Sequence, residues 1–274
     1  MDRHKCDMCG LYLHLDRAAC DQCQKHAGVV KRIVKAFRLE DMMEERMKIE
    51  KLEAMFPWND GVEQKEYSIQ NQIEELLLLA GNEDKDGIRR LLNHMENIGF
   101  YEMPCSGGNH LAKIGGLAEH SLNVTRYALS LLNVWYEEPY ISQWTDSVII
   151  CGLLHDIGKC GQFQKPGYVS NIIKDGRPTK AEPEQKYKQS ESKPFKVNPD
   201  LLNVPHEIRS VTIINEYIAL TEEEYHAILY HNGLYGPLYR EISGKETALY
   251  MILHFADMWC SRIVEEGDEQ DGEA

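Results

Sequence analysis

The chain has 274 residues, of which 43% are hydrophobic and 27% are charged, and this composition excludes a collagen-like or wholly disordered protein. Thirty Lys and Arg residues stand against 44 Asp and Glu residues, and the net charge of −14 argues against a protein that coats nucleic acid through bulk electrostatics. The longest apolar runs, Val148–Leu154 and Ala248–Leu253, fall far short of the roughly 18 residues that a membrane span requires. We expect a cytoplasmic protein with no membrane contact, because the N-terminus carries no hydrophobic signal core.

Two Cys-x2-Cys pairs lie within the first 23 residues, and they comprise Cys6, Cys9, Cys20 and Cys23. Four thiolates at the tips of two tight turns are typical of a structural zinc site, and zinc binding would fold a segment too small to have its own core. The alternative is reduced cysteines in an unstructured arm. We interpret residues 1–26 as a zinc ribbon. Because residues 1–38 hold eight basic and four acidic residues, the ribbon suits contact with either nucleic acid or a protein partner.

The rest of the chain reads as an all-α protein. Residues 27–98 form a predicted helical connecting region with one helix from Val29 to Pro57 and two more around Ile69–Ala80 and Ile88–Met95. Helical spacing of apolar residues continues after the turn-rich segment 104–110. It predicts five helices, which span Gly116–Trp135, Asp146–Ile157, His206–Ile218, Glu222–His231 and Glu246–Glu265.

Two segments of the chain depart from this helical pattern. The polar stretch between Cys160 and Pro205 holds six of the ten prolines and shows no convincing strand alternation, although Lys174-Asp175-Gly176 suggests a short hairpin turn. We expect this stretch to be either a lid over a site or an unstructured insertion. Residues 265–274 form an acidic segment that we expect to be a disordered tail.

Histidines and aspartates recur on the apolar faces or at the ends of the five predicted helices. His155 and Asp156 follow a strongly apolar helix in the motif LLHDIGK, and His120 lies in line with Leu117, Val124, Tyr127 and Leu131 on its own helix. The others are His206 and His231 at helix ends and Asp257 on an apolar stripe. Each alone is more often a core or capping residue than a ligand. Together they indicate a metal site of the kind that helical bundles build from inward-facing groups.

The ordered set of these residues resembles the HD-domain superfamily of metal-dependent phosphohydrolases. GGLAEHSLNV, LLHDIGK and HFADM are similar to its first-histidine, namesake and terminal-aspartate helices, and PHEIRS and ILYHNG resemble the additional histidines of the two-metal branch. The resemblance covers residues 99–264 and is closest to the HD domain of bacterial 3′-to-5′ exoribonucleases and to small phage HD proteins. Asn232 stands where relatives often have a second histidine.

The resemblance implies two divalent transition-metal ions, chosen among Mn, Fe, Co, Ni and Zn. One ion would be held by His120, His155, Asp156 and Asp257, and the other by Asp156 as a bridge together with His206 and His231. A water activated by the metals would then cleave a phosphate ester of a nucleotide or oligonucleotide. Catalytic roles fall to Asp156 and Lys159, and the expected substrate contacts are Lys159, His110, Lys113 and Arg209.

Three other functions fit the same sequence. Within the hydrolase class, the alternative substrate is single-stranded RNA or DNA degraded from its 3′ end. A different class is a mixed-valent di-iron oxygenase with a similar ligand set. The third is a non-enzymatic binding protein in which the metals only stabilise the helical bundle.

Overall fold

The structure is a computed structural model that describes residues 68–80, 84–137, 139–178 and 183–265, together with two short N-terminal strands. These strands, β1 (His4–Lys5) and β2 (Tyr12–Leu13), pair antiparallel. The chain divides into two compact units, Met1–Val62 and Glu63–Ala274. The four cysteines of the predicted zinc ribbon, the helix predicted from Val29 and the tail after Glu265 lie outside the described residues.

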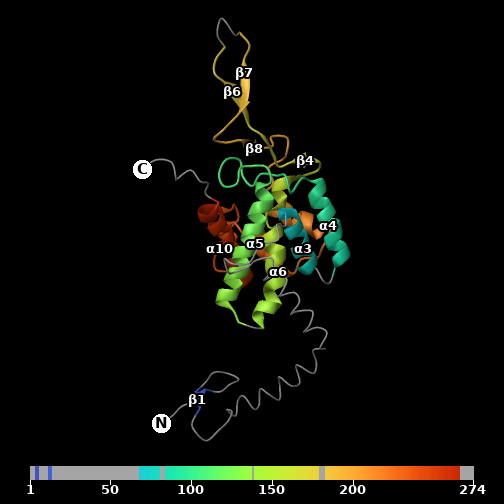
Figure 1. The fold of residues 1–274 in the computed structure, drawn as a ribbon, viewed down its shortest axis with the longest axis vertical. Coiled ribbons are helices and arrows are strands. Elements are labelled where there is room, and N and C mark those ends of the chain that lie inside the picture. Colours follow the sequence, from blue (N-terminus) through green and yellow to red (C-terminus); the bar gives the residue numbers. More distant parts are fainter. Residues whose placement is uncertain are drawn as a thin grey trace, which may run out of the picture. The chain divides into compact units, whose positions relative to one another are not determined.

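The described part of the second unit is mostly helical, as the sequence predicts (Figure 1). Its helices are α3 (Ile69–Ala80), α4 (Lys85–Asn97), α5 (Gly116–Trp135), α6 (Tyr140–Leu154), η1 (Ile157–Cys160), α7 (His206–Asn215), α8 (Glu222–Tyr230), η2 (Gly233–Tyr235), α9 (Tyr239–Ile242), α10 (Ala248–Trp259) and η3 (Cys260–Val264). The helices α3 and α4, which the sequence assigns to a connecting region, belong to the same compact unit as the later helices.

The core lies between α5 and α6, which pack along each other and are covered by α3 and α10. Its largest buried side chains include Leu117, Leu132 and Ile149. Gly152 lets the two helices approach, since a Cβ there would lie 2.6 Å from Oγ1 of Thr125 on α5. The predicted stripe on α5 is wrong at one position, because Tyr127 is 37% exposed whereas its neighbour Ala128 is buried.

The end of α6 differs from the predicted helix over Asp146–Ile157. The helix stops at Leu154, and the chain tightens into the 3-10 turn η1. Gly158 explains the close approach that follows, since a Cβ on this residue would collide with the carbonyl oxygen of His206 at the start of α7. The amide of Gly158 also donates a hydrogen bond to Oγ of Ser210, 2.9 Å away. The pair His155–Asp156 is therefore held in a turn directly beside α7.

The stretch between Cys160 and Pro205 contains antiparallel strand pairs instead of an unstructured insertion. These are β3 (Gly161–Gln162) with β4 (Lys165–Pro166), β5 (Tyr168–Ser170) with β8 (Phe195–Val197), and β6 (Ile172–Asp175) with β7 (Lys186–Gln189). The sequence indicated a hairpin at Lys174-Asp175-Gly176, but Asp175 pairs with Lys186, so the connection is a long loop and not a two-residue turn. The sequence does not predict these strands, because they are short and mostly exposed on both faces and so have no apolar alternation.

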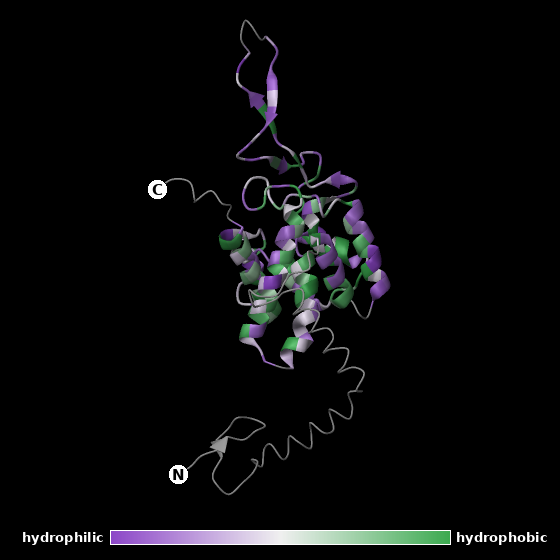
Figure 2. Cartoon of the chain, in the orientation of Figure 1, coloured by the Kyte–Doolittle hydropathy of each residue, from purple (hydrophilic) through white to green (hydrophobic). Residues whose placement is uncertain are grey.

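Hydrophobic residues concentrate where the helices face one another, and the β6–β7 hairpin is mostly hydrophilic (Figure 2). Within the described ranges, none of the helices combines the length and the apolar character that crossing a membrane would take.

Candidate metal centre

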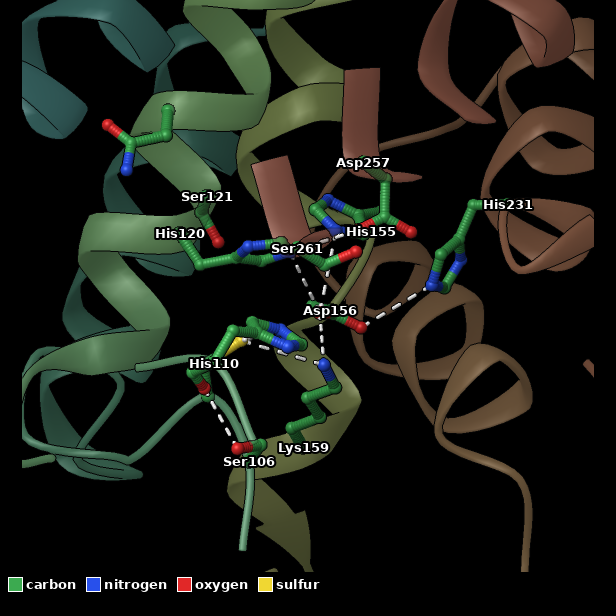
Figure 3. A network of polar contacts seen from close by, with 12 residues as sticks. Ser106, His110, His120, Ser121, His155, Asp156, Lys159, His231, Asp257 and Ser261 are labelled. Carbon is green, nitrogen blue, oxygen red and sulfur yellow. Dashed lines mark hydrogen bonds and ion pairs between the residues drawn. The ribbon is translucent and has the colours of Figure 1, made fainter. Parts of the chain in front are cut away.

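Six of the residues singled out in the sequence converge at one place in the second unit. His120 comes from α5, His155 and Asp156 from the turn between α6 and η1, and Asp257 from α10. His206 is the first residue of α7, and His231 directly follows α8. Figure 3 shows the side chains of His120, His155, Asp156, His231 and Asp257 facing one another.

The ligand atoms of these side chains lie close enough together to hold a metal ion. The nitrogen and oxygen atoms of His120, His155 and Asp257 lie within 4.8 Å of one another, and so do those of His155, Asp156 and His231. Nε2 of His120 lies 3.2 Å from Oδ1 of Asp257. The two groups share His155, so they form one continuous cluster.

The carboxylate of Asp156 lies between two sets of imidazoles. Its Oδ1 lies 3.1 Å from Nε2 of His206 and 3.4 Å from Nε2 of His231. Its Oδ2 lies 3.5 Å from Nε2 of His155 and 3.6 Å from Nε2 of His120. Each carboxylate oxygen thus faces a different histidine pair.

Several polar atoms of this cluster are buried without a hydrogen-bond partner among the described residues, namely Nε2 of His120, Nε2 of His155 and Oδ1 of Asp156. Buried polar atoms are normally satisfied, because leaving one unpaired costs free energy. A cation in the cluster would satisfy all three, so the residues fit a metal ion.

Hydrogen bonds on the far side of three rings orient the imidazoles toward the cluster. Nδ1 of His155 donates to the carbonyl oxygen of Gly152, 2.9 Å away, and Nδ1 of His231 donates to that of Ile228, 2.8 Å away. Nδ1 of His120 donates to Oε2 of Glu265 at 2.8 Å. Each bond fixes a proton on Nδ1 and turns Nε2 toward the cluster, as is usual for metal-binding histidines.

Glu265 was missed by the sequence analysis, which placed it at the start of a disordered tail. It is buried, and it also accepts a hydrogen bond from Nδ2 of Asn123. The reason is the π-type turn η3, whose wider i→i+5 spacing places Glu265 on the side of the last helix that carries Asp257. Nothing in the local pattern of the sequence signals such a turn.

A buried cysteine that the sequence analysis did not single out also borders the cluster. Sγ of Cys105 lies 3.2 Å from Nε2 of His110, and Cys105, His110 and His120 form a third group able to hold a metal ion. Burial alone would raise the pKa of the Cys105 thiol, but the charges of His120 and Lys159 and hydrogen bonds from His110 and His120 lower this pKa to about 6. The group is therefore suited to the thiolate form.

Lys159 faces the cluster from η1 and is not free for an external anion. Its ammonium lies 2.5 Å from Oδ2 of Asp156 and donates to Sγ of Cys105 at 3.7 Å. Burial opposes the charged form, yet the carboxylate of Asp156 holds the pKa of Lys159 well above its usual value. Burial alone would raise the pKa of Asp156, but the charges of Lys159 and His155 hold this pKa well below its usual value.

The other expected substrate contacts differ in their surroundings. Arg209 is buried and bonded within the protein, since Nη1 donates to Oε1 of Gln162 at 3.1 Å and Nη2 to the carbonyl oxygen of Leu202 at 2.6 Å. Arg209 is thus engaged within the protein, and its expected phosphate contact stays a prediction. Lys113 is half exposed and ion-paired with Glu119 at 2.8 Å, outside the cluster.

The cluster opens to solvent on the side of His206. The His206 side chain is 29% exposed, whereas those of His120, His155, Asp156 and His231 are almost fully buried. Mixed imidazole and carboxylate donors suit divalent transition metals. Comparison of the chain with protein-family models, with curated proteins and with solved structures found no match.

Proposed function

We propose that the chain is a metal-dependent phosphohydrolase of the HD-domain type that cleaves a phosphate ester of a nucleotide or oligonucleotide. The observation that carries this proposal is the position of Asp156, with each carboxylate oxygen facing a different histidine pair. A carboxylate in this position suits a bridge between two ions, and paired ions are a common solution for hydrolysis of phosphate esters.

The ligands divide naturally between the two ions. His120, His155 and Asp257 would hold one with Oδ2 of Asp156, and His206 and His231 would hold the other with Oδ1. Two bound divalent ions would supply Lewis acidity to the phosphoryl group and a water of lowered pKa. The open side at His206 gives a substrate access to the second position.

Asn232 lies beside the second position. Its amide nitrogen lies 2.9 Å from Nε2 of His231, 3.2 Å from Nε2 of His206 and 2.8 Å from Oε1 of Glu207. These contacts occupy the two ring nitrogens that would bind the second ion, so the Asn232 amide would have to give them up to an incoming cation. The Asn232 carboxamide occupies the place where relatives of the HD superfamily often have a further histidine.

Lys159 has two states in this scheme. Without a metal its ammonium neutralises Asp156, which would otherwise be a buried charge at the centre of the cluster. With divalent ions bound by the cluster, the ammonium of Lys159 would be free to contact a phosphate oxygen of the substrate. Cys105, at 3.7 Å, gives the ammonium a second anionic partner.

The test is hydrolysis of bis(4-nitrophenyl) phosphate and of a panel of nucleotides by protein loaded separately with each candidate metal. We expect Asp156→Asn to lose both metal and turnover, with the far-UV circular dichroism of the wild type. Asp86→Asn, the same chemical change at an exposed site on α4, should keep both. Asp257→Asn, which removes a ligand of one position only, should lower the metal content by half.

Three results would contradict the proposal. One is absence of hydrolysis with every metal and substrate tried. Another is wild-type turnover by Asp156→Asn. The third is turnover that stops when dioxygen is removed, because hydrolysis has no need of dioxygen and an oxygenase does.

A further inference from the structure

The β6–β7 hairpin is a surface element that buries none of its strand residues. All eight residues of Ile172–Asp175 and Lys186–Gln189 are exposed, and Figure 1 shows the hairpin extending beyond the β5–β8 pair, away from the helices of its unit. We call these two strands the arm. An isolated two-stranded ribbon is marginally stable in water and adds little to a core. Packing of a core therefore does not explain why the protein has the arm.

The register of the arm gives its two faces different chemistry. Directly opposed residues of an antiparallel pair lie on the same face. Ile173 opposite Lys188 and Asp175 opposite Lys186 make one face, where the ammonium of Lys188 is ion-paired with Glu191 at 3.0 Å.

The other face, which we call the binding face, has Ile172 opposite Gln189 and Lys174 opposite Tyr187. The binding face has no acidic residue, and its hydrophobic groups are open to solvent. The Tyr187 side chain is 61% exposed and Ile172 is 51% exposed. An exposed tyrosine beside a lysine is the pairing that stacks a nucleobase and neutralises a neighbouring phosphate.

The charge of the surrounding segment agrees with an anionic ligand. Residues 165–196 contain eight Lys and Arg residues and four Asp and Glu residues, whereas the whole chain carries −14. A local excess of positive charge in an acidic protein is selective, because the acidic parts of the surface repel a polyanion. The acidic chain as a whole disfavours nonspecific coating, so contact with a polyanion falls to its basic segments, which are this one and residues 1–38.

The base of the arm is attached to the elements that border the metal centre. The amide of Phe195 on β8 donates to the carbonyl oxygen of Gly107, in the loop that carries Cys105 and His110, at 3.1 Å. The amide of Gly167 donates to the carbonyl oxygen of Cys160, next to Lys159, at 2.9 Å. The β5–β8 pair, beyond which the arm extends, is thus tied to the segments that carry Cys105 and Lys159.

We propose that the binding face of the arm binds single-stranded nucleic acid by stacking a base on Tyr187 and contacting a phosphate through Lys174. As a statement about substrate this rests on the proposed function, which it deepens by naming a polymer as the substrate class. A duplex fits less well, because its bases are already stacked on one another and offer Tyr187 no free face.

The experiment measures binding of fluorescein-labelled oligouridylate and oligothymidylate, about 20 nucleotides long, which exceeds the footprint of a typical single-strand site. Fluorescence anisotropy is recorded with the full chain in the presence of EDTA, at a series of salt concentrations, and with a blunt duplex as a third probe. Comparison of the RNA probe with the DNA probe shows which sugar the protein prefers. Because EDTA prevents metal-dependent turnover, the assay measures binding alone and does not depend on hydrolysis.

We expect Tyr187→Ala to weaken binding of the single strands about 5- to 150-fold, while Tyr187→Phe keeps the stacking ring and wild-type affinity. Lys174→Gln should lower the slope of log affinity against log salt by about 0.7. Lys188→Gln is the matched control on the opposite face and should change affinity little, because its ammonium is already paired with Glu191.

Wild-type affinity in Tyr187→Ala, an equal loss in Lys188→Gln, or no binding of either single strand by the wild type would overturn this inference. Failure of the proposed function gives a different result, namely single-strand binding that depends on Tyr187 without cleavage once metal is added. If the protein cleaves nucleotides but its arm binds no single strand, the proposed phosphohydrolase activity stands and a polymeric substrate is excluded.

Discussion

The ammonium of Lys159 lies 2.5 Å from Oδ2 of Asp156, so the protein provides its own cation at the centre of the ligand cluster. Removing that positive charge should strengthen metal binding, because a lysine that neutralises Asp156 competes with the incoming ion. We therefore expect Lys159→Met to bind Mn²⁺ or Co²⁺ more tightly than the wild type. Turnover should fall about 100-fold, as when one donor to a developing anion is removed.

Isothermal titration with the metal and steady-state kinetics of the same preparation check this expectation. Lys85→Met is the control, since Lys85 is exposed at the start of α4 and has no role in the cluster. Weaker metal binding in Lys159→Met would show that Lys159 supports the metal site and does not compete with the ion.

Replacing Gly158 by alanine, the smallest residue with a side chain, should destabilise the fold. A Cβ at this position would collide with the backbone of His206 and approach the amide of Ser210, so Gly158→Ala must push α7 away from η1. We expect a loss of about 1–3 kcal/mol in the free energy of unfolding, as in other overpacked contacts. The metal content should drop because His206 moves.

Ser210→Ala gives the comparison for Gly158, since it removes only the hydrogen bond to the Gly158 amide and should cost about 1 kcal/mol while leaving the metal content unchanged. Urea unfolding and elemental analysis measure both effects. A Gly158→Ala variant with full metal content would show that α7 can shift without moving His206.

Glu265 orients His120 from the side away from the cluster. Replacing such a partner of a metal-binding histidine costs about 10- to 100-fold in metal affinity. We expect Glu265→Gln to show a loss in this range, with little change in the Michaelis constant once metal is saturating. Glu241→Gln, at an exposed site on α9, should behave as the wild type. Equal metal affinity in Glu265→Gln and the wild type would assign Glu265 a purely structural role.

Removal of the metal should lower the thermal stability of the second unit. Ligand that binds only the folded state stabilises it, by about 2.7 kcal/mol when its concentration is 100 times the dissociation constant. We expect EDTA to lower the melting temperature of the wild type and to leave that of Asp156→Asn unchanged. Differential scanning calorimetry makes the comparison, and an identical EDTA effect in the variant would place the stabilising metal elsewhere in the chain.

The sequence predicts well those features that depend on helical spacing. The bounds of α5 are the predicted ones, and His120 is buried on it as its apolar neighbours indicate. The helix α8 starts at the predicted Glu222, and the structure contains a capping box of Thr221 and Glu224 there. In each case the signal is local, because the residues that define it lie within a few turns of one another.

The features that the sequence did not predict depend on contacts between distant segments. Cys105 meets Lys159 across 54 residues, and Glu265 meets His120 across 145. Arg209 was expected to meet a phosphate because it lies three residues from His206, but closeness along the chain did not reveal that Gln162 and the backbone at Leu202 take up its hydrogen bonds. Such pairings have no periodic signature.

The most direct measurement is anomalous X-ray diffraction from crystals of the full chain grown with Mn²⁺. We expect two anomalous peaks on opposite sides of the Asp156 carboxylate, about 3.5–4 Å apart, as in other two-metal hydrolytic sites. One should contact His120, His155 and Asp257, and the other His206 and His231. Absence of a peak within bonding distance of Asp156 would contradict the central claim that this aspartate bridges a pair of ions.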